Sequence, residues 1–231
     1  MRKDPLYSYS VYLKKVINSF LPRGLHSISP FRFSEQNHWI EQEAGTIHGF
    51  DKYVEEQDRI PILIYELERL IQRNDPILDV GCNCGFYLNE IKKAGFTQLT
   101  GIDISPAAIT YGRQTFSFSA QELIIGSFED VLPEFIKDGR SFILTYSMGA
   151  TLELVHPSFD VIRAICEITE RYVILIIAEW GHRYPRFYEY EFNRQGFLLV
   201  KSLRPYNGKP STILPEQIYS LLLFERCAGR K

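Results

Sequence analysis

The feature that most constrains the fold of this 231-residue chain is a regular alternation that begins at residue 77. Short apolar runs, long enough for buried strands, alternate with longer segments of helical periodicity. The predicted strands are Ile77–Val80, Leu99–Asp103, Glu122–Ile125, Phe142–Tyr146, Tyr172–Glu179, Phe197–Leu203 and Ile218–Cys227. The helices predicted between the first six strands are Phe86–Ala94, Pro106–Gln114, Phe128–Lys137, Pro157–Glu170 and Pro185–Gln195.

This order predicts an α/β fold with a doubly wound, seven-stranded and mostly parallel sheet. Strands that alternate with helices of this length form right-handed crossovers, which place helices on both faces of the sheet. The last connection, Arg204 to Glu216, contains Pro205, Asn207, Gly208 and Pro210 and no helical pattern. We therefore expect the final strand to run antiparallel at the end of the sheet.

The N-terminal region differs in character, because residues 1–57 are aromatic and polar and contain no clear strand. An amphipathic pattern between Tyr7 and Phe20 predicts one helix, and apolar residues at helical spacing from Leu63 to Ile71 predict another. The predicted division is a helical N-terminal cap over residues 1–57, on the substrate side, and an α/β domain over residues 58–231.

Composition narrows the class of protein. Hydrophobic residues make up 45% and charged residues 23%, and the net charge of −2 offers no basic field for nucleic acid. The four cysteines lack the spacing of a zinc site or of a disulfide framework, so no metal is expected. The N-terminus lacks the pattern of a signal peptide, and the longest apolar run is too short to span a bilayer. These observations predict a cytoplasmic protein without a membrane or nucleic-acid partner. Whether it forms a homo-oligomer stays open.

The segment from Ile77 to Gly85 carries the strongest chemical signal. It reads Ile-Leu-Asp-Val-Gly-Cys-Asn-Cys-Gly, a buried strand that leads through a glycine-containing turn into a helix. Glycine permits positive φ and a close approach of the backbone to a ligand. Such a turn at the carboxyl end of the first strand is where nucleotide-like ligands bind in open α/β sheets.

Three further segments follow the next three strands. Asp103 ends the second strand, 24 residues after Asp79, where an acid can accept hydrogen bonds from ribose hydroxyls. Ser127 and Phe128 follow the third strand, where a polar group and an aromatic ring can contact the edge of an adenine. Tyr146-Ser-Met-Gly-Ala150 follows the fourth strand.

These four segments, in this order, resemble the class I S-adenosylmethionine-dependent methyltransferases over about residues 60–227. The resemblance implies S-adenosylmethionine as cofactor. It also implies a set of cofactor-binding residues: Asp79, Gly81, Asn83, Gly85, Asp103, Ile104, Ser127, Phe128 and Tyr146. Two positions depart from the family pattern, because Asn83 replaces its middle glycine and Ser127 stands where many relatives have an acid. Asn tolerates positive φ better than most residues.

The resemblance further implies transfer of a methyl group to a hydroxyl, or another nucleophile, of a small molecule. The aromatic cap looks most like bacterial methyltransferases of sugars and polysaccharide precursors. Glu179 and His182, which follow the fifth strand, are the candidate catalytic bases. The candidate substrate-binding residues are Trp39, His48, Tyr53, Met148, Trp180 and Tyr184. We expect the loop after the fifth strand and the cap around Trp39 to face each other across the sulfur of the cofactor.

Other interpretations stay open at this stage. The glycine turn can be a tight connection without a ligand, and His156, which precedes Pro157, is expected to cap or pack. A non-catalytic nucleotide-binding or scaffold protein would have the same fold. An NAD-linked oxidoreductase would use a similar turn, but the Gly-x-Gly-x-x-Gly spacing, counted from Gly81, falls on Asn83 and Phe86.

Overall fold

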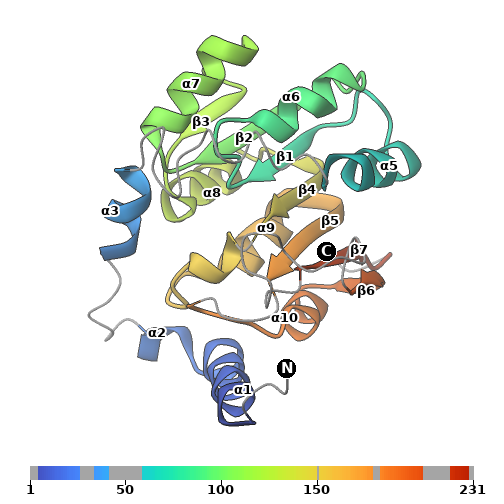
Figure 1. Cartoon of the computed structure of the whole chain (residues 1–231). Coiled ribbons are helices and arrows are strands. Elements are labelled where there is room, and N and C mark those ends of the chain that lie inside the picture. The colour runs from blue at the N-terminus through green and yellow to red at the C-terminus, as the bar shows by residue number, and fades with distance from the viewer. Residues whose placement is uncertain are drawn as a thin grey trace.

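The computed structural model describes residues 5–26, 34–41, 59–149, 151–178, 183–204 and 219–228. These residues form one seven-stranded sheet with helices on both faces (Figure 1). The strands are β1 (Ile77–Val80), β2 (Leu99–Asp103), β3 (Leu123–Ile125), β4 (Phe142–Met148), β5 (Thr169–Ala178), β6 (Phe197–Leu203) and β7 (Tyr219–Arg226). The predicted doubly wound α/β fold is confirmed.

The strand order is β3-β2-β1-β4-β5-β7-β6. Strands β1 to β5 pair in parallel, and β7 runs antiparallel to both of its neighbours, β5 and β6. The predicted antiparallel direction of the final strand is confirmed, but its predicted place at the end of the sheet is wrong. Residues 221–224 of β7 are all buried, so this strand needs cover on both faces, whereas β6 exposes Leu198 and Val200 and forms the edge.

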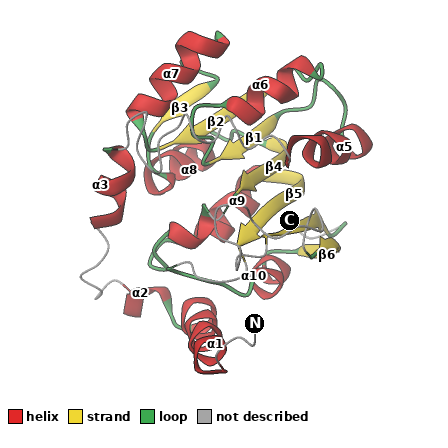
Figure 2. Ribbon diagram, in the orientation of Figure 1, coloured by secondary structure: helices red, strands yellow, loops and turns green. Residues whose placement is uncertain are grey.

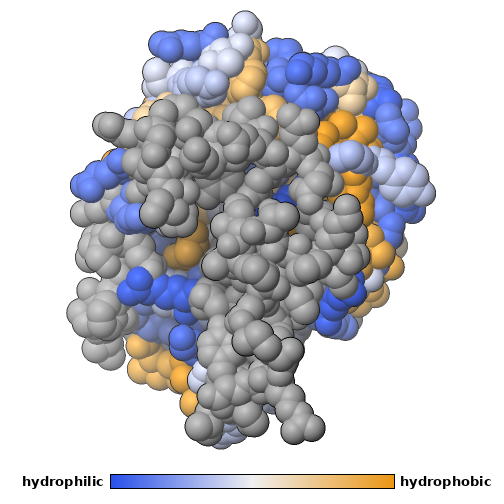
Figure 3. Space-filling view, in the orientation of Figure 1, coloured by the Kyte–Doolittle hydropathy of each residue, from blue (hydrophilic) through white to orange (hydrophobic). Residues whose placement is uncertain are grey.

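The helices divide between the two faces of the sheet (Figure 2). Helices α5 (Ile60–Leu70), α6 (Phe86–Lys93) and α7 (Pro106–Phe116) pack on one face, through apolar residues such as Leu67, Leu88 and Ile109. Helices α8 (Phe128–Lys137), α9 (Val161–Ile168) and α10 (Tyr188–Arg194) pack on the other. Hydrophilic side chains occupy much of the rim where α6 and α7 lie (Figure 3), as expected for the outer faces of amphipathic helices.

Two helices are shorter than predicted. Helix α9 begins at Val161 instead of Pro157, because the Asp160 side chain caps it by accepting the backbone N–H of Arg163, and β5 already begins at Thr169. Helix α10 begins at Tyr188 instead of Pro185. Residues 185–187 are not helical, and they contact the N-terminal region instead of continuing the helix.

The N-terminal region contributes α1 (Pro5–Phe20), α2 (Arg23–His26) and α3 (Ser34–Ile40). Helix α1 packs near α10, with Tyr12 and Phe20 against the ring of Phe187 at centroid distances of 5.6 and 6.1 Å (Figure 1). The helical character predicted for this region is therefore present, while the division at residue 57 stays a prediction. Within the described part of the chain, no helix is long and apolar enough to cross a membrane.

Candidate active site

A cavity opens at the carboxyl ends of β1, β2, β3 and β4, where four post-strand segments converge. Its wall also includes Gln36 and Trp39 from α3 and Arg59 from the start of α5. Helices α6 and α7 add Phe86, Tyr87 and Ala108, and the strand ends and the segments after them contribute the rest of the wall: Gly81–Cys84, Asp103–Ser105, Ser127–Glu129, Met148, Gly149, Thr151 and Leu154–His156. The four segments that the sequence analysis identifies after the first four strands therefore lie together at this edge of the sheet.

The turn after β1 has the backbone that its residues predict. Gly81, Asn83 and Gly85 have φ values of 83°, 51° and 75°. The conformation expected for Asn83 is confirmed, and its side-chain oxygen accepts the Cys84 N–H at 2.7 Å. A Cβ on Gly81 would lie 2.3 Å from Thr151 Cγ2, so the close approach of the two post-strand segments requires glycine.

Asp103 joins the first turn to the end of β2. Its Oδ2 accepts the Asn83 N–H at 2.8 Å, and its Oδ1 accepts the Ser105 N–H at 2.9 Å. Burial raises the pKa of the Asp103 carboxyl, and these backbone N–H groups oppose that rise. Each carboxylate oxygen has a further lone pair for a ligand, and both Asp103 and the neighbouring Ile104 line the cavity.

Ser127 and Phe128, predicted to contact the cofactor, also lie on the wall. Ser127 is the N-cap of α8, and its hydroxyl accepts the Asp130 N–H at 3.2 Å and donates to the Asp130 carboxylate at 2.6 Å. Glu129 completes this part of the wall. It supplies an acid close to the position where Ser127 departs from the family pattern.

Three predicted cofactor residues lie behind the wall. Asp79 and Tyr146 are 1% and 0% exposed, and Gly85 is the N-cap of α6. Burial raises the pKa of Asp79 well above its usual value, because it disfavours the charged carboxylate. A direct contact with a cofactor stays a prediction for these three residues.

On the side of the cavity toward the cap, the predicted residues Trp39 and Met148 are on the wall. Tyr184 is not, but its ring packs edge-on against His156 at 5.1 Å, and its N–H donates to the Glu153 carbonyl at 2.9 Å. His26 of the cap lies on another side of the same imidazole, at 6.4 Å. The segment after β5 and the cap thus meet at His156. The remaining predicted residues, His48, Tyr53, Glu179, Trp180 and His182, lie outside the described residues.

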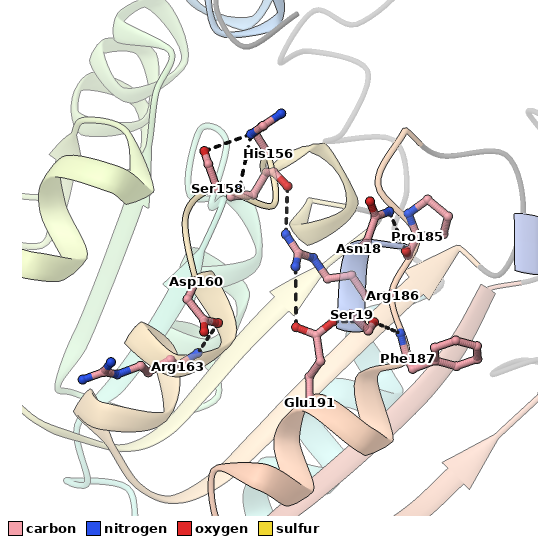
Figure 4. A network of polar contacts seen from close by, with 11 residues as sticks. Asn18, Ser19, His156, Ser158, Asp160, Arg163, Pro185, Arg186, Phe187 and Glu191 are labelled. Atoms are coloured by element: carbon pink, nitrogen blue, oxygen red, sulfur yellow. Dashed lines mark hydrogen bonds and ion pairs between the residues drawn. The ribbon is translucent and has the colours of Figure 1, made fainter. Parts of the chain in front are cut away.

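His156 is a wall residue that the sequence assigned only to capping or packing. Its Nδ1 accepts the backbone N–H of Ser158 at 3.2 Å and contacts the Ser158 hydroxyl at 2.9 Å (Figure 4). Since a backbone N–H can only donate, the neutral imidazole carries its proton on Nε2. In that form Nε2 donates a hydrogen bond and does not accept a proton.

Arg59 is a second wall residue that sequence reasoning missed. It is 8% exposed, and its guanidinium lies 4.6 Å from the centre of the Tyr219 ring. A Cβ on Gly149 would come within 2.8 Å of its Nη1, so Gly149, at φ 74°, leaves room for the guanidinium. No local pattern marks this arginine, because tertiary packing alone brings it to the turn after β4.

The cysteines of the first turn are structural. Cys82 and Cys84 are buried, and burial raises the pKa of the Cys84 thiol to about 11. A protonated, buried thiol is a poor nucleophile and a poor metal ligand. Among the residues that the structure describes, no cluster of three potential metal ligands occurs.

Comparison with known proteins agrees with this geometry. Residues 77–171 match a family model described as "Methyltransferase domain". No curated protein sequence matches the chain. Magnesium protoporphyrin IX methyltransferase from Synechocystis, solved with bound SAM, is similar in structure, with 15% identity and a TM-score of 0.59, over 94% of this chain and 96% of that one.

Two other solved structures show the range of proteins with this fold. The N-methyltransferase NodS from Bradyrhizobium japonicum, in complex with S-adenosyl-L-homocysteine, has 13% identity and a TM-score of 0.59, over 84% of this chain and 98% of that one. The [4+2]-cyclase SpnF has 14% identity and a TM-score of 0.59, over 76% of this chain and 82% of that one. Residues 77–171 are thus similar to a methyltransferase domain, and the chain shares the fold of methyltransferases solved with bound SAM or S-adenosyl-L-homocysteine, with a cavity at the ends of β1 to β4.

Proposed function

We propose that this protein transfers a methyl group from S-adenosylmethionine to a hydroxyl, or another nucleophile, of a small molecule, with sugars and polysaccharide precursors as the first acceptors to test. The observation that carries the proposal is the position of Asp103. Its carboxylate lies on the cavity wall and is hydrogen-bonded to the glycine turn, so a ribose and a methionyl group can be bound side by side.

The charges and shapes along the wall fit this cofactor in one direction. Asp103 and Glu129 make the β2–β3 end acidic, which suits ribose hydroxyls, and Ile104 and Phe128 offer apolar surfaces for an adenine ring. Arg59, beside the turns after β1 and β4, makes the other end basic. A guanidinium there suits the methionyl carboxylate. We therefore place the adenosine at β2–β3 and the methionyl group near Arg59.

The acceptor is assigned to the part of the cavity formed by Trp39, Met148 and residues 154–156. Bound S-adenosylmethionine supplies an electrophilic methyl group on its sulfonium, so the protein must align the nucleophile and exclude water. Trp39 provides a flat apolar surface on which a sugar ring can stack. His156 donates through Nε2 to an acceptor oxygen, which orients that oxygen without removing a proton. Glu179 and His182 remain the proposed bases for a hydroxyl acceptor.

The first experiment measures binding of S-adenosylhomocysteine by calorimetry. We expect binding by the wild type, and a loss of about 10- to 100-fold in affinity for Asp103→Ala, because the lost hydrogen bonds involve a charged group. The matched control is Asp138→Ala, which removes an acid at the far end of α8. A folded wild-type protein that binds neither S-adenosylmethionine nor its demethylated product would refute the proposal.

The second experiment identifies the acceptor. The protein is incubated with S-adenosylmethionine carrying a labelled methyl group and with pools of sugars, nucleotide sugars and other hydroxylated metabolites, and labelled products are separated by mass spectrometry. Label in a sugar supports the proposed acceptor class. Label only in another small molecule would reject sugars while preserving methyl transfer.

A second candidate function comes from the similarity to a cyclase. Because the [4+2]-cyclase SpnF has this fold, the fold alone does not require methyl transfer. A non-catalytic nucleotide-binding protein or an NAD-linked oxidoreductase could also be built on such a sheet. Binding of S-adenosylhomocysteine without consumption of S-adenosylmethionine would favour a cyclase or a scaffold. A change in nicotinamide absorbance would favour the oxidoreductase.

A further inference from the structure

Behind residues 154–156 of the cavity wall lies a cluster of buried polar side chains (Figure 4). Its charged members are Glu153, Arg186 and Glu191, which are 1%, 1% and 4% exposed. None of them lines the cavity, so none is placed to touch a cofactor or an acceptor. Buried charges are expensive unless they are paired, which makes the contacts of this cluster informative.

Arg186 connects the cavity wall to helix α10. Its Nη2 donates to the Val155 carbonyl at 2.9 Å, and its Nη1 lies 3.5 Å from the Glu191 carboxylate. Val155 is itself a wall residue, between Leu154 and His156. The buried guanidinium therefore links the backbone of the wall to α10 through one directional hydrogen bond and one ion pair.

The same carboxylate is held from its other side by the N-terminal region. Ser19, near the end of α1, donates to Glu191 Oε1 at 2.7 Å and accepts the Phe187 N–H at 2.9 Å. Asn18 donates to the Pro185 carbonyl at 2.9 Å. A continuous path of polar contacts thus runs from α1 through Glu191 and Arg186 to the Val155 carbonyl, across more than 160 positions of sequence.

The wall has a second attachment to the same segment, because Tyr184 donates its N–H to the Glu153 carbonyl and packs on His156. Apolar packing alone would hold the wall near the core, but it is not directional. Polar contacts with defined geometry fix a single position of a segment. The wall at 154–156 is short and irregular, so it gains more from such contacts than a regular strand would.

We propose that Arg186 is a positioning residue, which holds the cavity wall at residues 154–156 through Val155 and couples that wall to helix α1 through Glu191 and Ser19. The inference rests on the proposed function, in which this wall binds the acceptor. Its consequence is that α1, although remote from the cofactor end of the cavity, sets the geometry in which the acceptor meets the methyl group.

The test measures amide hydrogen exchange, without any ligand, in the wild type and in Ser19→Ala. The Val155 N–H donates to the Leu152 carbonyl and the Phe159 N–H to the His156 carbonyl, so both amides report on the wall. If α1 is coupled to the wall, Ser19→Ala raises their exchange on the order of 2- to 10-fold, the factor that one ordinary hydrogen bond represents. Faster exchange confined to α1 and α10 would overturn the proposal. Lys14→Ala, at an exposed position of α1, is the control.

A second comparison separates positioning from general stability. Arg186→Lys keeps the charge and one contact, so it should retain most of the protection at Val155, whereas Arg186→Met should lose it. If Arg186→Met does not fold, Ser19→Ala and Arg186→Lys decide the matter. If the Val155 amide is equally protected from exchange in the wild type and in a folded Arg186→Met variant, the guanidinium does not position the wall and the proposal is refuted.

The functional measurement uses S-adenosylhomocysteine and, after the labelling experiment, the acceptor found there. In Ser19→Ala we expect the affinity for S-adenosylhomocysteine to stay within about 2-fold of the wild-type value, which is the smallest change that the loss of one ordinary hydrogen bond represents. The KM for the acceptor should rise. A matching loss for both ligands would indicate a purely structural role and contradict the proposal. Failure of the wild type to bind S-adenosylhomocysteine would refute the proposed function, while the exchange experiment would still test the coupling.

Discussion

Glu153 provides the sharpest test of the electrostatics behind the cavity wall. It lies in the short 3-10 helix Leu152–Leu154, and neither carboxyl oxygen has a hydrogen-bond partner among the described residues. Burial raises its pKa to about 7, and Arg186 and the nearby Tyr188 hydroxyl, which does not reach hydrogen-bonding geometry, offset only part of that rise. The side chain is therefore neutral at acidic pH and charged above neutrality.

The raised pKa of Glu153 determines how the stability of the fold changes with pH. An acid with a raised pKa binds its proton more tightly in the folded state than in the unfolded state. The contribution of Glu153 to the free energy of unfolding is therefore most favourable below its unfolded pKa of 4.5. That contribution is lost as the pH rises from 4.5 to about 7. Each unit of pKa shift corresponds to about 1.4 kcal/mol, so the change between pH 5 and pH 8 amounts to about 2–3 kcal/mol.

Glu153→Gln removes this titration and nearly conserves the shape of the side chain. Urea unfolding of the wild type and the variant at pH 5 and pH 8 gives two free-energy differences. We expect the variant to gain about 2–3 kcal/mol relative to the wild type between these two pH values. Glu134→Gln, at an exposed position of α8, should show no such change. A Glu153→Gln difference that stays constant within about 0.5 kcal/mol would show that Glu153 titrates normally and that our account of its burial is incorrect.

Three other changes test separate features. Gly112→Ala should lose stability near the upper end of about 1–3 kcal/mol in thermal unfolding, because a Cβ there would lie 2.0 Å from the Cys84 carbonyl oxygen; an unchanged Tm would mean that α7 is not packed so tightly on the first turn. Ser105→Ala should cost about 1 kcal/mol, since the hydroxyl accepts the Ala108 N–H as the N-cap of α7. In native protein a thiol reagent should react rapidly with Cys227 alone, because the other three cysteines are buried; rapid labelling of Cys84 would contradict its burial.

The sequence predicts the turns that follow β1, β2 and β3 well because the determinants there are local. A strand, a glycine turn and a helix start are consecutive in the chain, and the carboxyl ends of parallel strands meet at one edge of the sheet. Asp103 and Ser127 could therefore be placed by counting along the alternation. The conformation of Asn83 follows from its place between two glycines that also have positive φ.

The wall toward the cap could not be assembled in this way. Arg59 and His156 both line the cavity through packing between segments far apart in the sequence, and no local pattern marks Arg59. The contacts of Arg186 likewise join three segments whose proximity only the fold creates. For these residues, spacing along the chain carries little information about distance in space.

The place of β7 is an intermediate case. Residues 221–224 form an unbroken apolar run, which is typical of a strand covered on both faces, while β6 alternates between buried and exposed positions. This contrast was readable in the sequence. The prediction for β7 was drawn from its connection to β6, residues 204–216, and the lack of a helical pattern there does not determine which strands neighbour β7.

The insertion of β7 between β5 and β6 also has a consequence for the order in which the chain acquires its structure. During synthesis β6 emerges before β7, yet β7 is its only partner in the described sheet. Until residues 219–226 leave the ribosome, β6 has no strand to pair with and the side of β5 that pairs with β7 is open. Such an unpaired edge can recruit other chains. The nascent protein should therefore depend most on chaperones, or on slow elongation, in the interval between these two strands.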